Sequence, residues 1–312
     1  MTTSFPGMNP LHRHMGICDG RVVIVTGSGR GIGREHALAY AAEGAKVVVN
    51  DLGGDMHGDG GSLSPAMEVV EEIKAMGGEA VADGENVADF AGAGRMIQRA
   101  IDTFGHLDTL VNNAGILRDR MLANMEESEW DAVIAVHLKG AFSPTRHAAA
   151  YWRDQSKAGT PIKARVVNTS SPSGIFGNAG QTNYGAAKAG IAAFTIICGL
   201  ELGRYGVCTN AIAPVARTRM TENLGFGAPA AGTWDALDPA NISPLVVWLG
   251  SNDNEDVSGR VFLVDGDRVS VAEGWHRGPT ATNNKMRWEP AQLTKVVPDL
   301  VAQATEPSNM LS

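Results

Sequence analysis

The sequence is poor in the patterns that mark several large classes of protein. Only three cysteines occur among its 312 residues, Cys18, Cys198 and Cys208. They cannot form a paired disulfide framework, and no spacing among them suggests a zinc or other metal site. Free cysteines favour a reducing compartment, so we expect a cytoplasmic protein. No apolar run reaches the roughly 18 residues of a membrane span, and the N-terminus lacks the apolar segment of a secretory signal. We therefore expect no membrane partner.

Positive charge is scarce as well. Lys and Arg number 26 against 34 Asp and Glu, which gives a formal net charge of −8. This balance argues against a nucleic-acid partner. The hydrophobic fraction of 44% and the charged fraction of 19% indicate a globular chain. Glycine, in contrast, is abundant, with 38 residues, well above the usual share of about 7%. The fold must therefore need backbone freedom at particular points.

Apolar runs typical of strands alternate with stretches of helical periodicity. We expect strands over 22–25, 46–50, 110–111, 164–169, 207–212 and 261–264, and helices over 32–43, 64–76, 89–104, 126–157, 186–204 and 239–249. Repeated strand–helix units predict an α/β fold with one Rossmann-like, doubly wound parallel sheet. Pro144 is expected to kink the long helix.

The alternation covers residues 21–266, which we interpret as a single nucleotide-binding domain. Residues 1–20 form an N-terminal leader and residues 267–312 a C-terminal extension. Trp275 and Trp288 lie in this extension, and aromatic residues are uncommon in disordered tails. We expect the extension to pack over the substrate cleft or against a neighbouring subunit.

A glycine-rich segment, T-G-S-G-R-G-I-G from Thr26, follows the first expected strand. Glycines let the backbone approach a pyrophosphate closely, and the next helix offers free N–H groups and the positive end of its dipole. The spacing departs from the usual G-x-G-x-x-G, but the position between strand and helix is the required one. A turn without a ligand is the alternative. We expect dinucleotide contacts from Gly27, Arg30, Gly31, Ile32 and Gly33.

Asp51 ends the second expected strand, 24 residues after Gly27. A carboxylate there can accept hydrogen bonds from both hydroxyls of an adenosine ribose and would repel a 2′-phosphate. It therefore predicts NAD rather than NADP, the alternative being a solvated carboxylate. Asn86 and Val87 follow a further strand between the helices expected over 64–76 and 89–104. They are expected beside the adenine, although a helix-capping role suits Asn86 nearly as well.

Tyr184 and Lys188 form a Y-x-x-x-K pair, and Ser171 lies 13 residues before the tyrosine. The four-residue spacing places both side chains on one helix face. A tyrosine with its usual pKa of about 10 is a poor base, and a nearby ammonium and an oxidised nicotinamide both favour its phenolate. A serine hydroxyl can hold a substrate oxygen. The three residues suit the interconversion of an alcohol and a ketone.

With Asn113-Ala114-Gly115 and the segment Asn210 to Pro214, these motifs resemble the short-chain dehydrogenase/reductase family over about residues 21–266. The resemblance implies that Asn113, Ala114 and Gly115 support the central strands beside the cofactor. It implies that Tyr184 and Lys188 also bind the cofactor, Lys188 through the nicotinamide ribose. Pro214, Val215 and Thr218 would contact the nicotinamide, and the helices 126–157 and 186–204 would pack across subunits of a homodimer or homotetramer.

Further segments resemble the (3R)-hydroxyacyl-CoA dehydrogenase unit of type 2 peroxisomal multifunctional enzymes, which are also 17β-hydroxysteroid dehydrogenases. They are NDLGGD from Asn50, GILRDR from Gly115, VHLKG from Val136 and GIFGN from Gly174. His137 occupies the position of a catalytic Asn in the wider family, whose backbone carbonyl holds a relay water. A packed helix histidine is the alternative. Val215 stands where Pro-Gly is usual.

The resemblance implies an NAD-dependent oxidoreductase in lipid or sterol breakdown, acting on a 3-hydroxyacyl-CoA or a steroid-derived CoA thioester. A 17β-hydroxysteroid dehydrogenase acting on free steroids, an NADPH-dependent ketoreductase and a non-catalytic nucleotide-binding regulator remain alternatives. An apolar lid is expected over residues 219–234. Cations that can meet CoA phosphates are Arg118, Arg120, Arg277, Lys285 and Arg287.

Overall fold

The computed structural model describes residues 16–54, 57, 60–217 and 233–308. Eight strands form one sheet in the order β3-β2-β1-β4-β5-β6-β7-β8. The first seven are parallel, and β8 is antiparallel to β7. Their bounds are β1 Val22–Thr26, β2 Lys46–Asn50, β3 Glu79–Asp83, β4 Thr109–Asn112, β5 Ala164–Thr169, β6 Val207–Val215, β7 Val261–Asp265 and β8 Arg268–Ala272. The expected doubly wound α/β fold is confirmed.

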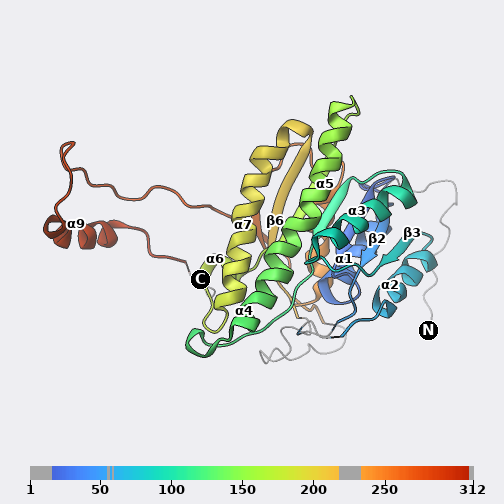
Figure 1. Cartoon of the computed structure of the whole chain (residues 1–312), viewed down its shortest axis with the longest axis horizontal. Coiled ribbons are helices and arrows are strands. Elements are labelled where there is room, and N and C mark those ends of the chain that lie inside the picture. Colours follow the sequence, from blue (N-terminus) through green and yellow to red (C-terminus); the bar gives the residue numbers. More distant parts are fainter. Residues whose placement is uncertain (1–15, 55–56, 58–59, 218–232, 309–312) are drawn as a thin grey trace.

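Helices cover both faces of the sheet, with α3, α5 and α7 together on one face (Figure 1). The side chains of β1 alternate between two apolar cores, since Val23 and Val25 pack on one side and Val22 and Ile24 on the other. The helices are α1 Gly31–Ala42, α2 Ser64–Ala75, α3 Phe90–Phe104, α4 Glu127–Ile134, α5 Gly140–Lys157, α6 Pro172–Phe176, α7 Thr182–Leu202, α8 Ser243–Gly250 and α9 Pro290–Gln303. Short 3₁₀ turns span Leu122–Asn124, Gly203–Tyr205 and Pro239–Ile242.

The strand order fixes where a ligand can bind. From β1 the chain adds β2 and β3 on one side and then returns to place β4 on the other. Loops at the carboxyl ends of β1 and β4 therefore diverge, which opens the crevice in which such sheets bind nucleotides. The glycine-rich segment and Asn113 both follow strands that border this crevice.

The long helix expected over 126–157 is interrupted. Between α4 and α5 lies a π-helical segment, η2 (Ala135–Lys139), and it ends one turn before Pro144. Pro144 itself lies inside α5. A π segment holds one additional residue per turn and is frequent at functional sites. The disturbance thus falls at His137 and not at the proline.

Helix α7 is unusually apolar. Within the described part of the chain, the stretch Thr182–Tyr205 is the one with the length and mean hydropathy of a membrane span, and 28% of it is buried. Its first turns carry Tyr184 and Lys188, and it packs beside β6 (Figure 1). Packing within the chain therefore covers only part of its apolar surface, and Ile196, Ile197 and Leu200 remain exposed.

The chain continues the sheet beyond residue 266, because β8 forms a hairpin with β7. Residues 273–289 then run away from the body as an extended segment to α9 (Figure 1). None of the residues of α9 is buried, so this structure does not show the extension over the cleft of its own chain. The expected lid lies outside the described residues except for 233–234.

Candidate active site

The glycine-rich segment after β1 is shaped by close backbone contacts. Gly27 has φ of +63°, and a β-carbon there would lie 2.7 Å from Cα of Ala114. A β-carbon on Gly33 would lie 2.2 Å from the carbonyl oxygen of Gly27. These positions therefore admit only glycine without rearrangement. The loop leads directly into the first turn of α1, where free N–H groups can receive a phosphate.

Asn113 ties this loop to the end of β4. Its backbone N–H donates to Oγ1 of Thr26 at 2.9 Å, and its Nδ2 donates to the carbonyl oxygens of Thr26 at 3.0 Å and Gly27 at 3.1 Å. The adjacent N–H of Ala114 donates to the same threonine hydroxyl at 3.1 Å. The amide thus fixes the phosphate loop relative to the central strands.

Asp51 stands beside the loop at the end of β2. Its Oδ2 accepts a hydrogen bond from the N–H of Gly29 at 2.8 Å, and its Oδ1 accepts one from Gly53 at 2.7 Å. Each carboxylate oxygen has a second lone pair available. The negative charge is therefore held at the loop, where it can receive ribose hydroxyls and oppose a phosphate.

The residues after β3 also line the cleft. Val87 is buried, whereas Oδ1 of Asn86 accepts a hydrogen bond from the N–H of Ala88 at 2.9 Å. Asn86 thus closes a turn just before α3, whose N-cap is Asp89, and the Nδ2 donor of Asn86 is left for other contacts.

Ser171, Tyr184 and Lys188 meet where β5 ends. Ser171 is the N-cap of α6, and its Oγ accepts from the N–H of Ser173 at 3.2 Å. Tyr184 and Lys188 lie in the first two turns of α7, and Nζ of Lys188 lies 5.4 Å from the centre of the tyrosine ring. Nζ donates to the carbonyl oxygen of Thr169 at 2.5 Å. The three side chains therefore share one end of the cleft.

Burial dominates the protonation of this pair. It raises the pKa of Tyr184 to about 12, against the opposing effect of the hydrogen bond with Ser171. It lowers the pKa of Lys188 to about 7. In the chain alone both groups are thus driven toward their neutral forms, and the expected support of the phenolate by the ammonium is outweighed. The positive ring of an oxidised nicotinamide, when bound, favours the phenolate.

His137 projects from the π segment against the tyrosine. The two rings meet edge to face with centres 5.1 Å apart. Burial, together with a smaller effect of the positive charge of Lys188, lowers the pKa of His137 to about 3. Its Nε2 lies 2.8 Å from the carbonyl oxygen and 3.1 Å from the nitrogen of Ile116. The imidazole is therefore neutral at physiological pH.

Behind Lys188 lies a small cavity of about 10 Å³. Its lining includes His137, Asn112 and Thr169, each of which has one buried polar atom without a protein partner: Nδ1, Oδ1 and Oγ1, respectively. A buried water needs about this volume and two to four polar partners. His137 is thus packed in the core and at the same time borders a cavity that could hold a relay water, so the geometry fits both interpretations of this residue.

One cleft of about 820 Å³ collects nearly every residue singled out from the sequence. Those lining it are Gly27, Arg30, Gly31, Ile32, Gly33, Asp51, Asn86, Val87, Asn113, Ala114, Gly115, His137, Ser171, Tyr184, Lys188, Pro214 and Val215. Thr218 lies outside the described residues. The tight glycine loop and the placed carboxylate of Asp51 fit a dinucleotide along this cleft.

A hydrogen-bonded group of cleft residues, Asp119, Ser173 and Gln181, was given no role from the sequence. Nε2 of Gln181 donates to Oδ2 of Asp119 at 2.7 Å, and Oγ of Ser173 donates to Oε1 of Gln181 at 2.7 Å. Burial raises the pKa of Asp119. Ser173 and Gln181 lie between Ser171 and Tyr184 in the sequence, and this position could have suggested them, whereas Asp119 comes from the distant segment after β4. They give the substrate end of the cleft a polar wall.

Residues 21–226 match the family model described as short chain dehydrogenase, so the chain belongs to the short-chain dehydrogenase family. It is 45% identical to the hydroxyacyl-CoA dehydrogenase ChsB1 of Mycobacterium tuberculosis over 291 residues, 91% of this chain and 89% of that one. It is 46% identical to the peroxisomal multifunctional enzyme type 2 of Drosophila melanogaster over 82% of this chain, but covers 40% of that longer protein.

Among solved structures, a short chain dehydrogenase from Mycobacterium avium is 58% identical, with a TM-score of 0.85. The match covers 94% of this chain and 99% of that one. Residues 1–272 make up less than 94% of the 312 residues, so the match extends into the C-terminal extension.

From its family and its relatives, the chain is an oxidoreductase that acts on CH–OH groups and uses a nicotinamide cofactor, NAD or NADP.

Proposed function

We propose that the protein is an NAD-dependent dehydrogenase of 3-hydroxyacyl-CoA thioesters, including steroid-derived ones. The observation that carries the proposal is the meeting of Ser171, Tyr184 and Lys188 at one end of a cleft whose other end holds Asp51. The names of the two relatives, a hydroxyacyl-CoA dehydrogenase and a peroxisomal multifunctional enzyme, support the substrate class.

The residues divide the chemistry of alcohol oxidation among them. Ser171 Oγ accepts from a backbone N–H and faces Tyr184, so its proton can be donated to a substrate oxygen that lies between the two hydroxyl groups. Tyr184 takes the hydroxyl proton as general base, a role typically worth 10²- to 10⁴-fold. Lys188 donates to the carbonyl oxygen of Thr169, and in its protonated form it supplies positive charge behind the phenol. A bound nicotinamide would supply the hydride acceptor for the carbon that bears the hydroxyl group.

The cofactor preference follows from Asp51. A carboxylate held by two backbone N–H groups cannot turn away from the loop without losing both hydrogen bonds. Its charge would therefore lie against the extra phosphate of NADP. This supports NAD and disfavours the biosynthetic NADPH-dependent ketoreductase.

The expected CoA-binding cations fall into two groups. Arg120 forms an ion pair with Glu129 at 2.8 Å, beside the substrate end of the cleft. Arg277, Lys285 and Arg287 lie on the C-terminal extension, beyond the body of their own chain (Figure 1). Contacts from these three to a CoA phosphate therefore fit the cleft of another copy better than their own.

We also propose a cytoplasmic homodimer or homotetramer. The outward face of α7 carries Ile196, Ile197 and Leu200, which are 40%, 52% and 81% exposed. Apolar side chains in such a row favour contact with a second copy. The long helices α5 and α7 are the surfaces we expect to pair.

A substrate panel tests the proposal. The purified protein is given NAD or NADP with a (3R)-hydroxyacyl-CoA, its free acid, or a 17β-hydroxysteroid, and reduced cofactor is followed by absorbance. We expect the CoA thioester with NAD to have the highest kcat/KM, at least about tenfold above the free acid, which corresponds to about 1.4 kcal/mol. Equal rates on thioester and acid would contradict CoA recognition, and no turnover of any secondary alcohol would favour a non-catalytic regulator.

A further inference from the structure

The C-terminal arm, defined as residues 273–308, leaves the body from the edge of the sheet. Its first residue follows β8, the last strand in the sheet order. The chain then extends away from the α/β body and ends in α9 and a short tail (Figure 1). The arm therefore has a defined helix that its own body does not support.

Helix α9 carries a continuous apolar stripe. Leu293, Val296, Val297, Leu300 and Val301 recur at the spacing of one helix face. None of them is buried, and Val297 and Val301 are 49% and 69% exposed. Isolated helices shorter than about 12–15 residues are marginal in water, and α9 has 14 residues with Pro298 inside it. Its stability therefore requires a surface that covers the stripe.

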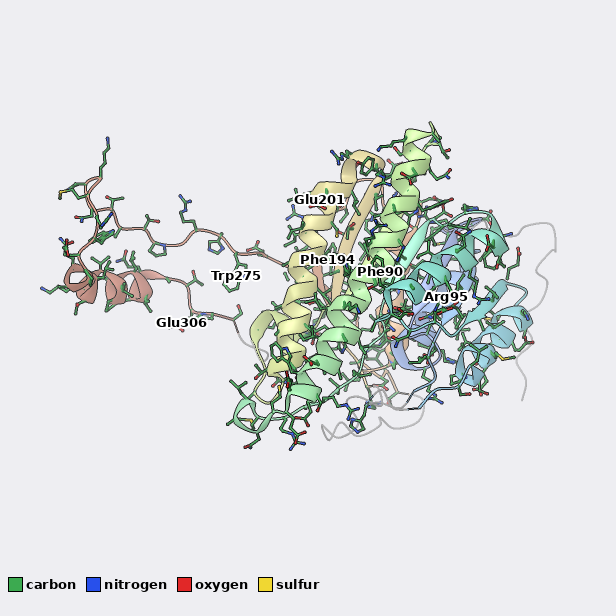
Figure 2. The ribbon with its side chains drawn as sticks, in the orientation of Figure 1. Phe90, Arg95, Phe194, Glu201, Trp275 and Glu306 are labelled. Carbon is green, nitrogen blue, oxygen red and sulfur yellow. The ribbon has the colours of Figure 1, made fainter. Side chains whose placement is uncertain are left out.

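Trp275 gives a second, independent sign of a missing contact. It lies on the arm, outside the body (Figure 2), with a relative exposure of 105%. Tryptophan is highly buried on average and is enriched in the cores of protein interfaces. A fully exposed tryptophan at the start of the arm indicates a binding residue.

The first half of the arm is basic, and this charge points to the chain itself as the partner. Between Gly274 and Trp288 the arm carries Arg277, Lys285 and Arg287 and no Asp or Glu, while the whole chain has a formal net charge of −8. Over its full length the arm is neutral, because four Asp and Glu residues balance four Lys and Arg residues. Complementary charge steers association and selects partners. A second copy offers both an acidic body and the exposed apolar row of α7, and in a symmetric pair each copy covers the other's arm.

We propose that the C-terminal arm is an assembly element that grips a second copy of this chain, with the apolar stripe of α9 and Trp275 buried against the partner. The proposal rests on the self-association proposed above. It adds that the arm, and not the long helices alone, carries part of the contact.

A pair of matched variants tests this. Leu300→Asp places a charge on the apolar stripe, while Ala302→Asp places the same charge two residues further, on the opposite exposed face. The full-length chain and both variants are compared by sedimentation over a range of concentrations and by hydrogen exchange of the amides in α9. We expect assembly and amide protection in the full-length chain and in Ala302→Asp. We expect Leu300→Asp to lose the protection and to raise the dissociation constant for assembly at least tenfold.

The outcomes separate this proposal from self-association. An assembled protein in which α9 exchanges as fast as a free peptide would overturn the arm proposal and leave self-association standing. So would unchanged assembly of Leu300→Asp. A chain that stays monomeric at all concentrations would overturn both, and protection of α9 in such a monomer would show that it packs on its own chain.

Discussion

At the residue scale, the central feature is that burial shifts the pKa values of Lys188, Tyr184 and His137 toward their neutral forms. The pKa of Lys188 is lowered to about 7, that of Tyr184 is raised to about 12 and that of His137 is lowered to about 3. His137 therefore does not change charge near neutral pH. Its contribution must come from its shape, its backbone carbonyl or the unpartnered Nδ1 in the small cavity.

Asp51 makes a prediction about cofactor choice. Asp51→Asn keeps an oxygen acceptor beside the loop but removes the negative charge, and hydrogen bonds to charged groups are stronger by about 1 kcal/mol or more. We expect the ratio of kcat/KM with NAD to that with NADP to fall by about tenfold. Steady-state kinetics with both cofactors measure this ratio. Glu71→Gln, which removes an exposed carboxylate on α2, is the matched control, and an unchanged ratio in Asp51→Asn would refute the role of the charge.

At the element scale, the turn from β1 into α1 sets the cleft. A β-carbon on Gly33 would lie 2.2 Å from the carbonyl oxygen of Gly27 and 2.4 Å from Nδ2 of Asn113. We therefore expect Gly33→Ala to displace the loop, to weaken NAD binding at least tenfold and to destabilise the fold by about 1–3 kcal/mol, the usual cost of overpacking. Calorimetric titration and thermal unfolding measure the two effects.

Gly203→Ala is the control for this substitution. Gly203 has no heavy atom within 4 Å of the position of an added β-carbon and lies at the end of α7. Its substitution should leave NAD binding unchanged. Equal NAD affinity in both variants would mean that the close approach at Gly33 does not shape the loop.

Local sequence signals predicted the elements that frame the cleft. The β-branched run of β1, the glycines after it and the Y-x-x-x-K pair each carry their information within a few residues. The π segment was not predicted because one inserted residue hardly alters the helical periodicity over 126–157. Pro144, which lies after this segment, was expected to be the site of the kink instead. Helix α7 begins at Thr182, four residues before the expected start. The start was expected too late because Thr182, Asn183 and Gly185 have low helix propensity.

Local sequence signals did not predict the C-terminal strand or the polar wall of the cleft, because both depend on contacts between distant segments. Strand β8 alternates apolar and polar residues over only five positions, and its partner β7 decides that it joins the sheet. The polar wall of Gln181, Asp119 and Ser173 depends on three segments meeting in space. The roles assigned to the cleft residues stay predictions until they are measured.

At the scale of the whole molecule, buried histidines predict acid sensitivity. Burial lowers the pKa of both His36 and His137 from 6.5 to about 3. A group whose pKa is lower in the folded state contributes stability that is present above pH 6.5 and is lost as the pH falls toward 3. We expect the free energy of unfolding to fall over this window by up to about 1.4 kcal/mol per pH unit for each group.

Variants of one buried and one exposed histidine check the assignment. His36→Asn should reduce the slope of unfolding free energy against pH by about one proton, whereas His276→Asn on the exposed arm should not change it. Chemical denaturation at a series of pH values gives the slopes. Identical slopes in all three proteins would show that the acid sensitivity has another origin.

The most direct test of the whole account is the turnover of Tyr184→Phe with NAD and a 3-hydroxyacyl-CoA. The phenyl ring keeps the contact with His137 but cannot take the hydroxyl proton. We expect turnover to fall by about 10²- to 10⁴-fold while calorimetric titration shows that NAD still binds. Turnover within a few-fold of the unmodified protein would contradict the assignment of Tyr184 as the base, and with it the proposed dehydrogenase mechanism.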